Sequence, residues 1–143
     1  MLDLSGKQRT LRTAVASGVL LMRPETLARL RKNDLPKPDP LPTARAAACL
    51  AAKRTPDLIP DCHPISLTHV DVAFRLLDPD RIEVTATVRT EDRTGVEMEA
   101  LTATAVACLT IYDIAKGVDP GMQITDLALQ SKTGGKSDYA AQA

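Results

Sequence analysis

The chain has 143 residues, enough for one domain with a single hydrophobic core and too few for two ordinary domains. Its 18 basic and 18 acidic residues balance, and it contains one Phe, two Tyr and no Trp. A general nucleic-acid binder usually carries a basic excess and aromatic residues for stacking, so this composition argues against one. Three cysteines without a C-x-x-C pair fit a reduced, cytoplasmic compartment and favour neither a disulfide framework nor a zinc site.

The N-terminus carries no sign of a membrane or export segment. Its first ten residues are polar, and the apolar run Val19 to Met22 is too short to span a membrane. We therefore expect a cytoplasmic protein that binds neither membranes nor nucleic acids.

The first half of the chain is predicted to begin with a strand and to continue as two helical pieces. Pro24 fits the first position of a short helix that runs to about Lys32. Segment 33–42 holds four prolines in ten residues and is expected to be an extended loop. Residues 43–53 are alanine-rich and predicted to be helical, and Pro56 ends this helix. The initial strand spans Arg9 to Met22 and places four apolar residues on one face: Leu11, Val15, Val19 and Leu21.

Two strands and a long helix follow. Residues 69–76 and 82–89 alternate between apolar and polar side chains, which indicates half-buried antiparallel strands joined by the turn 78–81. Residues 94–116 are predicted to form one helix that ends before Gly117. This helix is apolar on nearly every side, so we expect it to be buried.

The order of elements predicts an α+β fold in a single domain of residues 1–143. A last strand from Gln123 to Gln130 completes it, and the tail 136–143 is expected to be mobile. The natural packing is an antiparallel sheet with helices on one face, as in the ferredoxin-like split βαβ arrangement.

Charged side chains stand at both ends of the long helix. At its start, Thr94 to Glu97 match a capping box, so Glu97 has a structural explanation beside a ligand role. Glu99 has no such explanation and points away from Glu97. At its end, Asp113 and Lys116 share a face, as an ordinary exposed pair would. Carbonyl dipoles disfavour a carboxylate there, which favours a functional role for Asp113.

Two loop segments carry further candidates. Cys62-His63 lies between two prolines, and no second cluster completes a metal site, so an acid/base or substrate contact by His63 is favoured over zinc. Segment 132–137 (KTGGKS) fails the Walker pattern but keeps a glycine pair beside two lysines, which suits an anion. The remaining cations, each weak evidence by itself, are Arg12, Lys37, Lys53 and Arg54.

The length of the helix separates its two charged ends. A helix rises about 1.5 Å per residue, so Glu97 and Asp113 lie roughly 24 Å apart. No small ligand bridges that distance within one subunit. If both ends are functional, each site must combine one end with residues of a second chain. The sequence therefore predicts an oligomer with sites at subunit interfaces.

Several of these stretches, found together and in order, resemble the cyclic pyranopterin monophosphate synthase family of molybdenum cofactor biosynthesis. The resemblance extends from about Asp3 to Ser137. The matching stretches are Thr43-Ala44-Arg45, Ala51-Ala52-Lys53-Arg54-Thr55, Leu58-Ile59-Pro60, Cys62-His63-Pro64, Thr94 to Asp113, and Lys132-Thr133-Gly134-Gly135-Lys136-Ser137.

The resemblance implies a lyase that converts 3′,8-cyclo-7,8-dihydro-GTP into cyclic pyranopterin monophosphate and releases diphosphate. It also implies the ferredoxin-like fold and a homohexamer, a trimer of dimers, with active sites between subunits. No cofactor is expected to be required. Whether magnesium accompanies the substrate triphosphate stays open, because the sequence contains no dedicated set of metal ligands.

Residue roles follow from the resemblance position by position. In this hypothesis Lys116 and Lys132 donate protons while Asp113 orients one of them. Proton transfer also suits His63 and a lysine of lowered pKa, and fixed cations stabilise the leaving diphosphate. The implied catalytic residues are Asp113, Lys116, Lys132 and Lys37. The implied substrate contacts are Asp61, Cys62, His63, Met98, Glu99, Glu97 and Arg12.

Three features depart from the family pattern. Pro38 stands where the family usually has glycine, which stiffens the loop that carries Lys37. Asp61 replaces a usual apolar residue and adds negative charge near an anionic substrate. We also expect the chain to lack a leading segment, because it starts close to its first strand. Pro38 and Asp61 support a second hypothesis, a catalytically weak paralogue that binds a purine nucleotide or pterin as a regulatory or assembly subunit. A third hypothesis, which is all that pattern and composition alone support, is a non-catalytic ferredoxin-like interaction domain.

Overall fold

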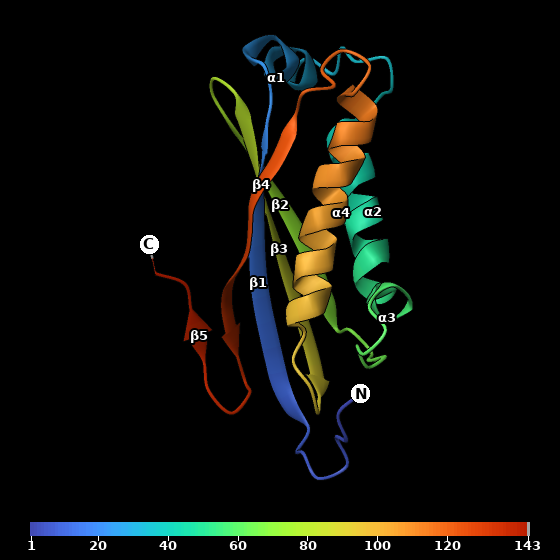
Figure 1. Cartoon of the computed structure of the whole chain (residues 1–143), viewed down its shortest axis with the longest axis vertical. Helices are drawn as coiled ribbons and strands as arrows, with labels where there is room; N and C mark the ends of the chain where they lie inside the picture. Colours follow the sequence, from blue (N-terminus) through green and yellow to red (C-terminus); the bar gives the residue numbers. More distant parts are fainter. Residues whose placement is uncertain (143) are drawn as a thin grey trace.

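Five strands form one antiparallel sheet in the computed structural model, which describes residues 1–142. Their spatial order is β2-β3-β1-β4-β5 (Figure 1). The order of the first four is that of a ferredoxin-like split βαβ unit, and it confirms the α+β prediction. The strands are β1 (Thr10–Leu21), β2 (His69–Leu77), β3 (Arg81–Asp92), β4 (Gln123–Thr133) and β5 (Tyr139–Ala140).

Helices cover one face of this sheet, as predicted. Figure 1 shows α2 and α4 side by side along that face, with α1 at one end of the molecule and α3 at the C-terminal end of α2. The helices are α1 (Pro24–Arg31), α2 (Pro40–Lys53), α3 (Thr55–Leu58) and α4 (Glu97–Ala115).

Small side chains let the two long helices and the sheet approach closely. A Cβ added at Gly18 of β1 would lie 3.3 Å from Thr104 of α4, so glycine suits this crossing. Larger side chains such as Leu20, Ile82 and Ile111 fill the remaining core, and burying each contributes about 1.5–3 kcal/mol. The fully buried alanines at these contacts include Ala14, Ala16, Ala44, Ala48, Ala100, Ala103 and Ala107.

The four apolar residues predicted to share a face of β1 lie away from the helices. The buried positions of β1 are the alternate ones, and Leu11, on the open face, is 65% exposed. Val15, Val19 and Leu21 are half-buried there, because neighbouring strands partly shield them. The sheet therefore has one face packed on helices and one face without a covering layer among the described residues.

Three predicted boundaries were wrong. Strand β4 ends at Thr133 and not at Gln130. Helix α2 begins at Pro40, because proline is tolerated in a first helical turn, so the loop predicted for 33–42 ends at Asp39. Helix α4 begins at Glu97 and not at Thr94, with Val96 as its N-cap residue and no side-chain cap hydrogen bond. The predicted capping box is therefore absent, and Glu97 is free of that structural role.

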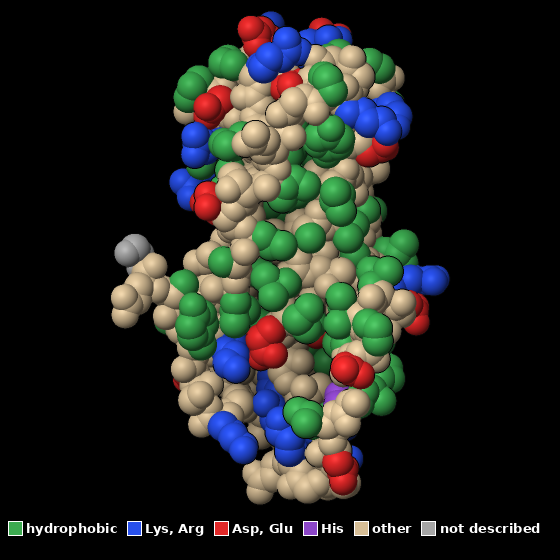
Figure 2. Space-filling view, in the orientation of Figure 1, with side chains coloured by type: hydrophobic (Ala, Val, Ile, Leu, Met, Phe, Trp, Pro, Cys, Tyr) green, Lys and Arg blue, Asp and Glu red, His purple; other side chains and the backbone are tan. Residues whose placement is uncertain are grey.

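The prediction that the long helix is buried holds for only part of its surface. Nine of its residues are buried, while Met98 is 38% exposed and Leu109 is 55% exposed. Helix α4 is long and apolar enough to cross a membrane by length and composition, but it packs along the sheet, and core helices pass the same test. Figure 2 shows apolar side chains across the middle of this face, with charged groups gathered toward both ends.

The tail expected to be mobile contains a strand that was not predicted. Tyr139 pairs with Lys132, and Ala140 pairs with Ser131 on β4. The backbone N–H of Ala141 also donates to the Gln130 carbonyl at 2.7 Å. Ala143, the last residue of this tail, lies outside the described residues.

Candidate functional site

Three of the predicted catalytic residues meet at the C-terminal end of α4. Lys37 Nζ lies 2.9 Å from Asp113 Oδ2, and Lys116 Nζ lies 2.9 Å from Asp113 Oδ1. All three side chains are slightly more than half exposed. We call Lys37, Asp113 and Lys116 the C-terminal cluster.

The two ammonium groups change the proton affinities within this cluster. Hydrogen bonds from Lys37 and Lys116 hold the pKa of the Asp113 carboxyl below its ordinary value of 3.8. Asp113 in turn raises the pKa of Lys116 above 10.5. The expected lysine of lowered pKa is therefore not Lys116 in this chain, because its carboxylate neighbour stabilises the charged form.

A short loop between α1 and α2 carries Lys37 into the cluster. Its base is closed by two hydrogen bonds, from Asn33 Nδ2 to Asp39 Oδ1 at 3.1 Å and from the Asp39 N–H to Asn33 Oδ1 at 2.9 Å. Both residues have positive φ angles, a region in which Asn and Asp are tolerated better than most residues. Pro38 stands inside this closed loop, directly beside Lys37.

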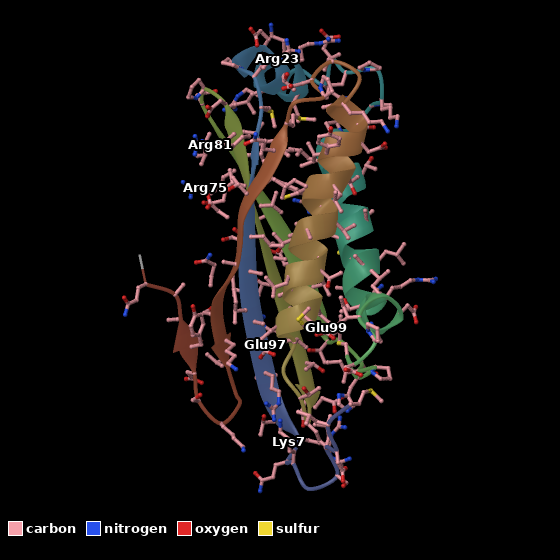
Figure 3. The ribbon with its side chains drawn as sticks, viewed as in Figure 1. Lys7, Arg23, Arg75, Arg81, Glu97 and Glu99 are labelled. Atoms are coloured by element: carbon pink, nitrogen blue, oxygen red, sulfur yellow. The ribbon has the colours of Figure 1, made fainter. Side chains whose placement is uncertain are left out.

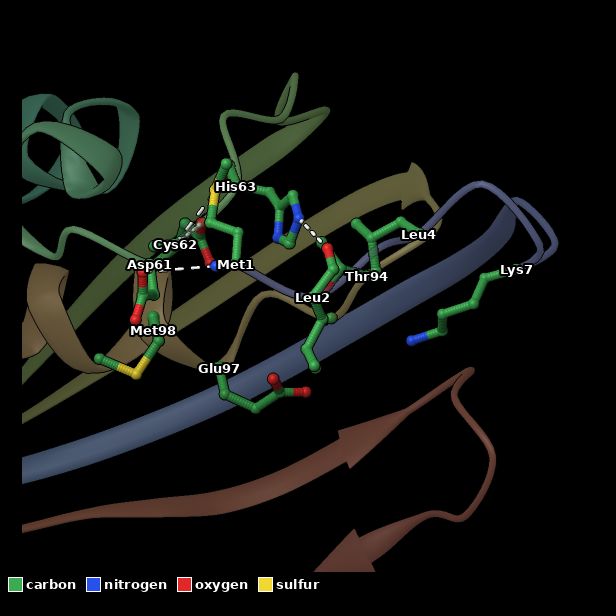
Figure 4. A pocket seen from close by; sticks show the side chains of 12 residues that line it. Met1, Leu2, Leu4, Lys7, Asp61, Cys62, His63, Thr94, Glu97 and Met98 are labelled. Carbon is green, nitrogen blue, oxygen red and sulfur yellow. Dashed lines mark hydrogen bonds and ion pairs between the residues drawn. The ribbon is translucent and has the colours of Figure 1, made fainter.

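A second group of predicted residues lines an open cavity at the N-terminal end of α4 (Figures 3 and 4). The cavity has a volume of about 460 Å³. The loop before β2 supplies three of the predicted residues, and the first turn of α4 supplies the others. The predicted residues in its wall are Asp61, Cys62, His63, Glu97, Met98 and Glu99.

Buried Glu99 and half-buried Cys62 form a pair in the wall of this cavity. Glu99 is only 2% exposed, and the Cys62 thiol donates to Glu99 Oε2 at 3.5 Å. Burial raises the pKa of the Glu99 carboxyl. Burial and the charge of Glu99 raise the pKa of Cys62 to about 11, so the thiol is poorly suited to act as a thiolate nucleophile at neutral pH.

The N-terminal segment closes one side of the same cavity. His63 Nε2 lies 2.8 Å from the Leu2 carbonyl, and the Met1 amino group lies 3.5 Å from Asp61 Oδ1. Lys7 also enters the wall, where Figure 4 shows its side chain pointing toward the cavity. Sequence reasoning did not select Lys7, and its place three residues before the first strand was the only available signal.

A smaller cavity of about 210 Å³ adjoins the first, and four of its ten lining residues are cationic. Arg12 is 7% exposed there, and its guanidinium donates to the Asp92 carbonyl at 3.0 Å, which holds it in place. Glu97 Oε1 lies 3.9 Å from Lys132 Nζ and is the acidic group of this wall. The basic residues in it are Lys7, Arg12, Lys132 and Lys136.

The glycine pair after Lys132 shapes this basic wall. Gly134 has φ +93°, and a Cβ at this position would lie 2.0 Å from the Leu11 carbonyl oxygen. The Thr10 hydroxyl donates a hydrogen bond to the Gly134 carbonyl at 2.6 Å. Glycine is therefore required for the chain to turn back against β1 and to hold Lys132 beside Arg12. The anion-holding role of segment 132–137 stays a prediction.

The predicted residues thus form two groups at opposite ends of one helix. Asp113 lies sixteen residues after Glu97, roughly 24 Å away along the helix axis. The C-terminal cluster offers two ammonium groups as proton donors, both paired with one ionised carboxylate. The N-terminal end offers basic residues for an anion beside a buried carboxyl whose pKa is raised. Among residues 1–142, no group of three or more His, Cys, Asp or Glu side chains is arranged to hold a metal ion.

Comparisons with known proteins match nearly the whole chain in sequence. A protein of Streptomyces coelicolor named cyclic pyranopterin monophosphate synthase is 56% identical over 137 residues, which are 96% of this chain and 80% of that protein. The protein of the same name from Roseiflexus sp. is 56% identical over 138 residues, 96% of this chain and 87% of the relative. Cyclic pyranopterin monophosphate synthase 2 of Mycobacterium tuberculosis is 54% identical over 136 residues, 95% of this chain and 81% of that protein. The family model described as the MoaC family matches residues 1–135, and the chain belongs to this family.

Proposed function

We propose that this chain is a cyclic pyranopterin monophosphate synthase of molybdenum cofactor biosynthesis. It converts 3′,8-cyclo-7,8-dihydro-GTP into cyclic pyranopterin monophosphate and releases diphosphate. The observation that carries the proposal is the match to the MoaC family over residues 1–135. The implied catalytic residues are all present, and each lies near one of the two ends of α4.

The basic wall suits the triphosphate of this substrate. Closing a cyclic phosphate and expelling diphosphate puts negative charge on the leaving oxygens, and fixed cations stabilise that charge. Arg12 is held by backbone carbonyls before any ligand binds, so its position costs no reorganisation during the reaction. Lys132 lies beside it and can donate a proton to a leaving oxygen.

The C-terminal cluster suits the proton transfers of ring opening and closure. Asp113 stays ionised over the whole neutral range because its pKa is lowered, so it holds the ammonium groups of Lys37 and Lys116 in place. In this proposal Lys116 donates a proton, and Asp113 orients it. The raised pKa of Lys116 in the free chain means that it carries the proton to be transferred.

The pair of Glu99 and Cys62 suits the purine-derived rings. A buried carboxyl can accept from or donate to ring nitrogens, depending on its protonation. His63 is half-buried above it and is within reach of a bound ring system once the contact with Leu2 opens. These three side chains, together with Met98, form the substrate-contacting part of the proposal.

The proposal includes a homohexamer, a trimer of dimers, with each active site shared between chains. The separation of the two clusters supports it, because one substrate cannot reach both in a single chain. The exposed apolar residues Met98 and Leu109 on α4 supply a second argument, since such a stripe is stabilised when another copy covers it. A cytoplasmic location and a reaction without a resident cofactor, with magnesium optional on the triphosphate, complete the proposal.

The decisive experiment incubates the purified protein with 3′,8-cyclo-7,8-dihydro-GTP and detects the pterin product and diphosphate. Formation of both in equal amounts is the expected result. Tight binding of the substrate without turnover would instead support the catalytically weak paralogue, for which the negative charge of Asp61 at the cavity rim is the favouring observation.

A further inference from the structure

A buried acid lies close to the C-terminal cluster but is not part of it. Asp119 follows Lys116 by three residues, in the turn between α4 and β4, and is only 4% exposed. Its backbone N–H donates to the Ala115 carbonyl at 3.0 Å, so the residue is fixed to the last turn of α4. The Tyr112 hydroxyl also donates to the Pro120 carbonyl at 2.7 Å, which ties the same turn to the helix a second time.

The Asp119 carboxylate caps α1, a helix from a distant part of the chain. Its Oδ2 accepts hydrogen bonds from the Arg23 N–H and from the Thr26 hydroxyl, both at 2.9 Å. Arg23 Nε lies 3.6 Å from Oδ1. Arg23 is the N-cap residue of α1, and its own side chain makes no capping hydrogen bond there. A helix start leaves unpaired donors and favours negative charge. Asp119 accepts from the backbone N–H of the N-cap residue and places negative charge at this helix start.

This contact joins the two segments that carry the C-terminal cluster. Helix α1 leads directly into the loop that bears Lys37, while Asp113 and Lys116 stand on the last turn of α4. Figure 3 shows Arg23 at the end of the molecule where α1 meets the end of α4. Within the described residues, the Lys37 side chain makes one polar contact with α4, the exposed ion pair with Asp113. Exposed ion pairs hold segments together weakly.

The buried contact is the stronger constraint of the two. If the hydrogen bonds to a buried carboxylate are lost, polar groups remain unpaired away from water, and this costs folding free energy. We propose that Asp119 is a positioning residue that fixes α1 on the end of α4 and thereby sets the separation of Lys37 from Asp113 and Lys116. Its effect on catalysis rests on the proposed function, whereas its effect on the geometry of the cluster does not.

The first test measures geometry in the protein without substrate. The pKa of the Asp113 carboxyl is followed by carbon NMR in wild type, in Asp119→Asn and in the control Asp57→Asn, an exposed acid of α3. We expect the pKa to rise toward its ordinary value in Asp119→Asn, because Lys37 is held less closely, and to stay lowered in the control. An unchanged pKa in a folded Asp119→Asn protein would overturn the inference.

The second test measures turnover. Misplacing a catalytic group by about 1 Å costs on the order of 100-fold in rate, so we expect kcat of Asp119→Asn to fall by about that factor with KM nearly unchanged. A wild-type kcat in this variant would also overturn the inference. If wild type itself forms no pterin product, the proposed function fails, and the NMR measurement alone decides the positioning role.

A milder pair of variants covers the case in which Asp119→Asn does not fold. Thr26→Val removes one hydrogen bond to Asp119 and leaves the charge, so the pKa of Asp113 should shift in the same direction by less. Thr26→Ser keeps the hydroxyl and should match wild type. Equal behaviour of Thr26→Val and Thr26→Ser would count against the inference.

Discussion

The two ends of α4 carry carboxylates in opposite environments. Asp113, at the C-terminal end, is half exposed between two ammonium groups, and its pKa is lowered. Glu99, at the N-terminal end, is buried against a thiol, and its pKa is raised. One helix therefore presents two carboxyl groups whose pKa values are shifted in opposite directions. Such a divergence is typical of sites in which two carboxyl groups have different tasks.

The largest expected effect is at the C-terminal end. Replacing Asp113 by Asn removes the group that orients both lysines, so kcat should fall by roughly 1,000-fold, within the usual range for proton-transfer groups. The pKa of Lys116 should also fall, since Asp113 is what raises it. Steady-state kinetics and NMR titration of lysine side chains measure the two effects. The control Asp71→Asn alters an exposed acid of β2, and an undiminished kcat in Asp113→Asn would contradict the account.

The next effect is expected at the N-terminal end, in the turn that holds Lys132. Ala at position 134 would meet the Leu11 carbonyl at a positive φ, so Gly134→Ala should lower the free energy of unfolding by about 1–3 kcal/mol. The displaced Lys132 should raise KM. Denaturant unfolding compares it with Gly117→Ala, where a Cβ meets nothing within 4 Å. Equal stability of the two variants would show that the turn is not strained by a side chain.

The smallest effect concerns the buried carboxyl and should depend on pH. Because the folded-state pKa of Glu99 is raised above 4.5, the native state binds more protons than the unfolded state above that pH. Stability therefore declines as pH rises from 4.5 through the folded-state pKa. Glu99→Gln removes this loss and should stabilise the protein by about 1–3 kcal/mol at neutral pH. Denaturant unfolding at neutral pH and below pH 4.5 should show the gain only at the higher pH. A gain of equal size at both would contradict the assigned cause.

The sequence predicted the strands and helices well where the periodicity of side chains decides the structure. Alternation located β1, β2 and β3 within a few residues, because each has one face against the helices. It did not predict β5, whose two residues are stabilised by pairing with β4 rather than by burial. It also placed the start of α4 too early, since Thr94 to Glu97 match a capping box that the chain does not form.

The sequence indicated which residues to consider for the candidate site, but it did not predict the contacts between them. The resemblance identified Lys37 and Asp113, yet their ion pair joins positions 76 residues apart and depends on how α1 and α4 meet. The hydrogen bond between Cys62 and Glu99 is also a tertiary contact, and no local spacing in the sequence predicts it. Helix length, by contrast, is local, and it predicted correctly that the two groups lie at separate ends.

Subunit complementation tests the central claim, which is that the two ends of α4 from different chains combine into one active site. Asp113→Asn impairs only the C-terminal end, and Lys132→Met impairs only the N-terminal end. Each variant alone should be almost inactive. After dissociation and reassembly of an equal mixture, about one quarter of shared sites should contain two intact halves, so activity should return to about that fraction of wild type. Reassembled mixtures that stay as inactive as the single variants, or full activity in a stable monomer, would contradict the claim.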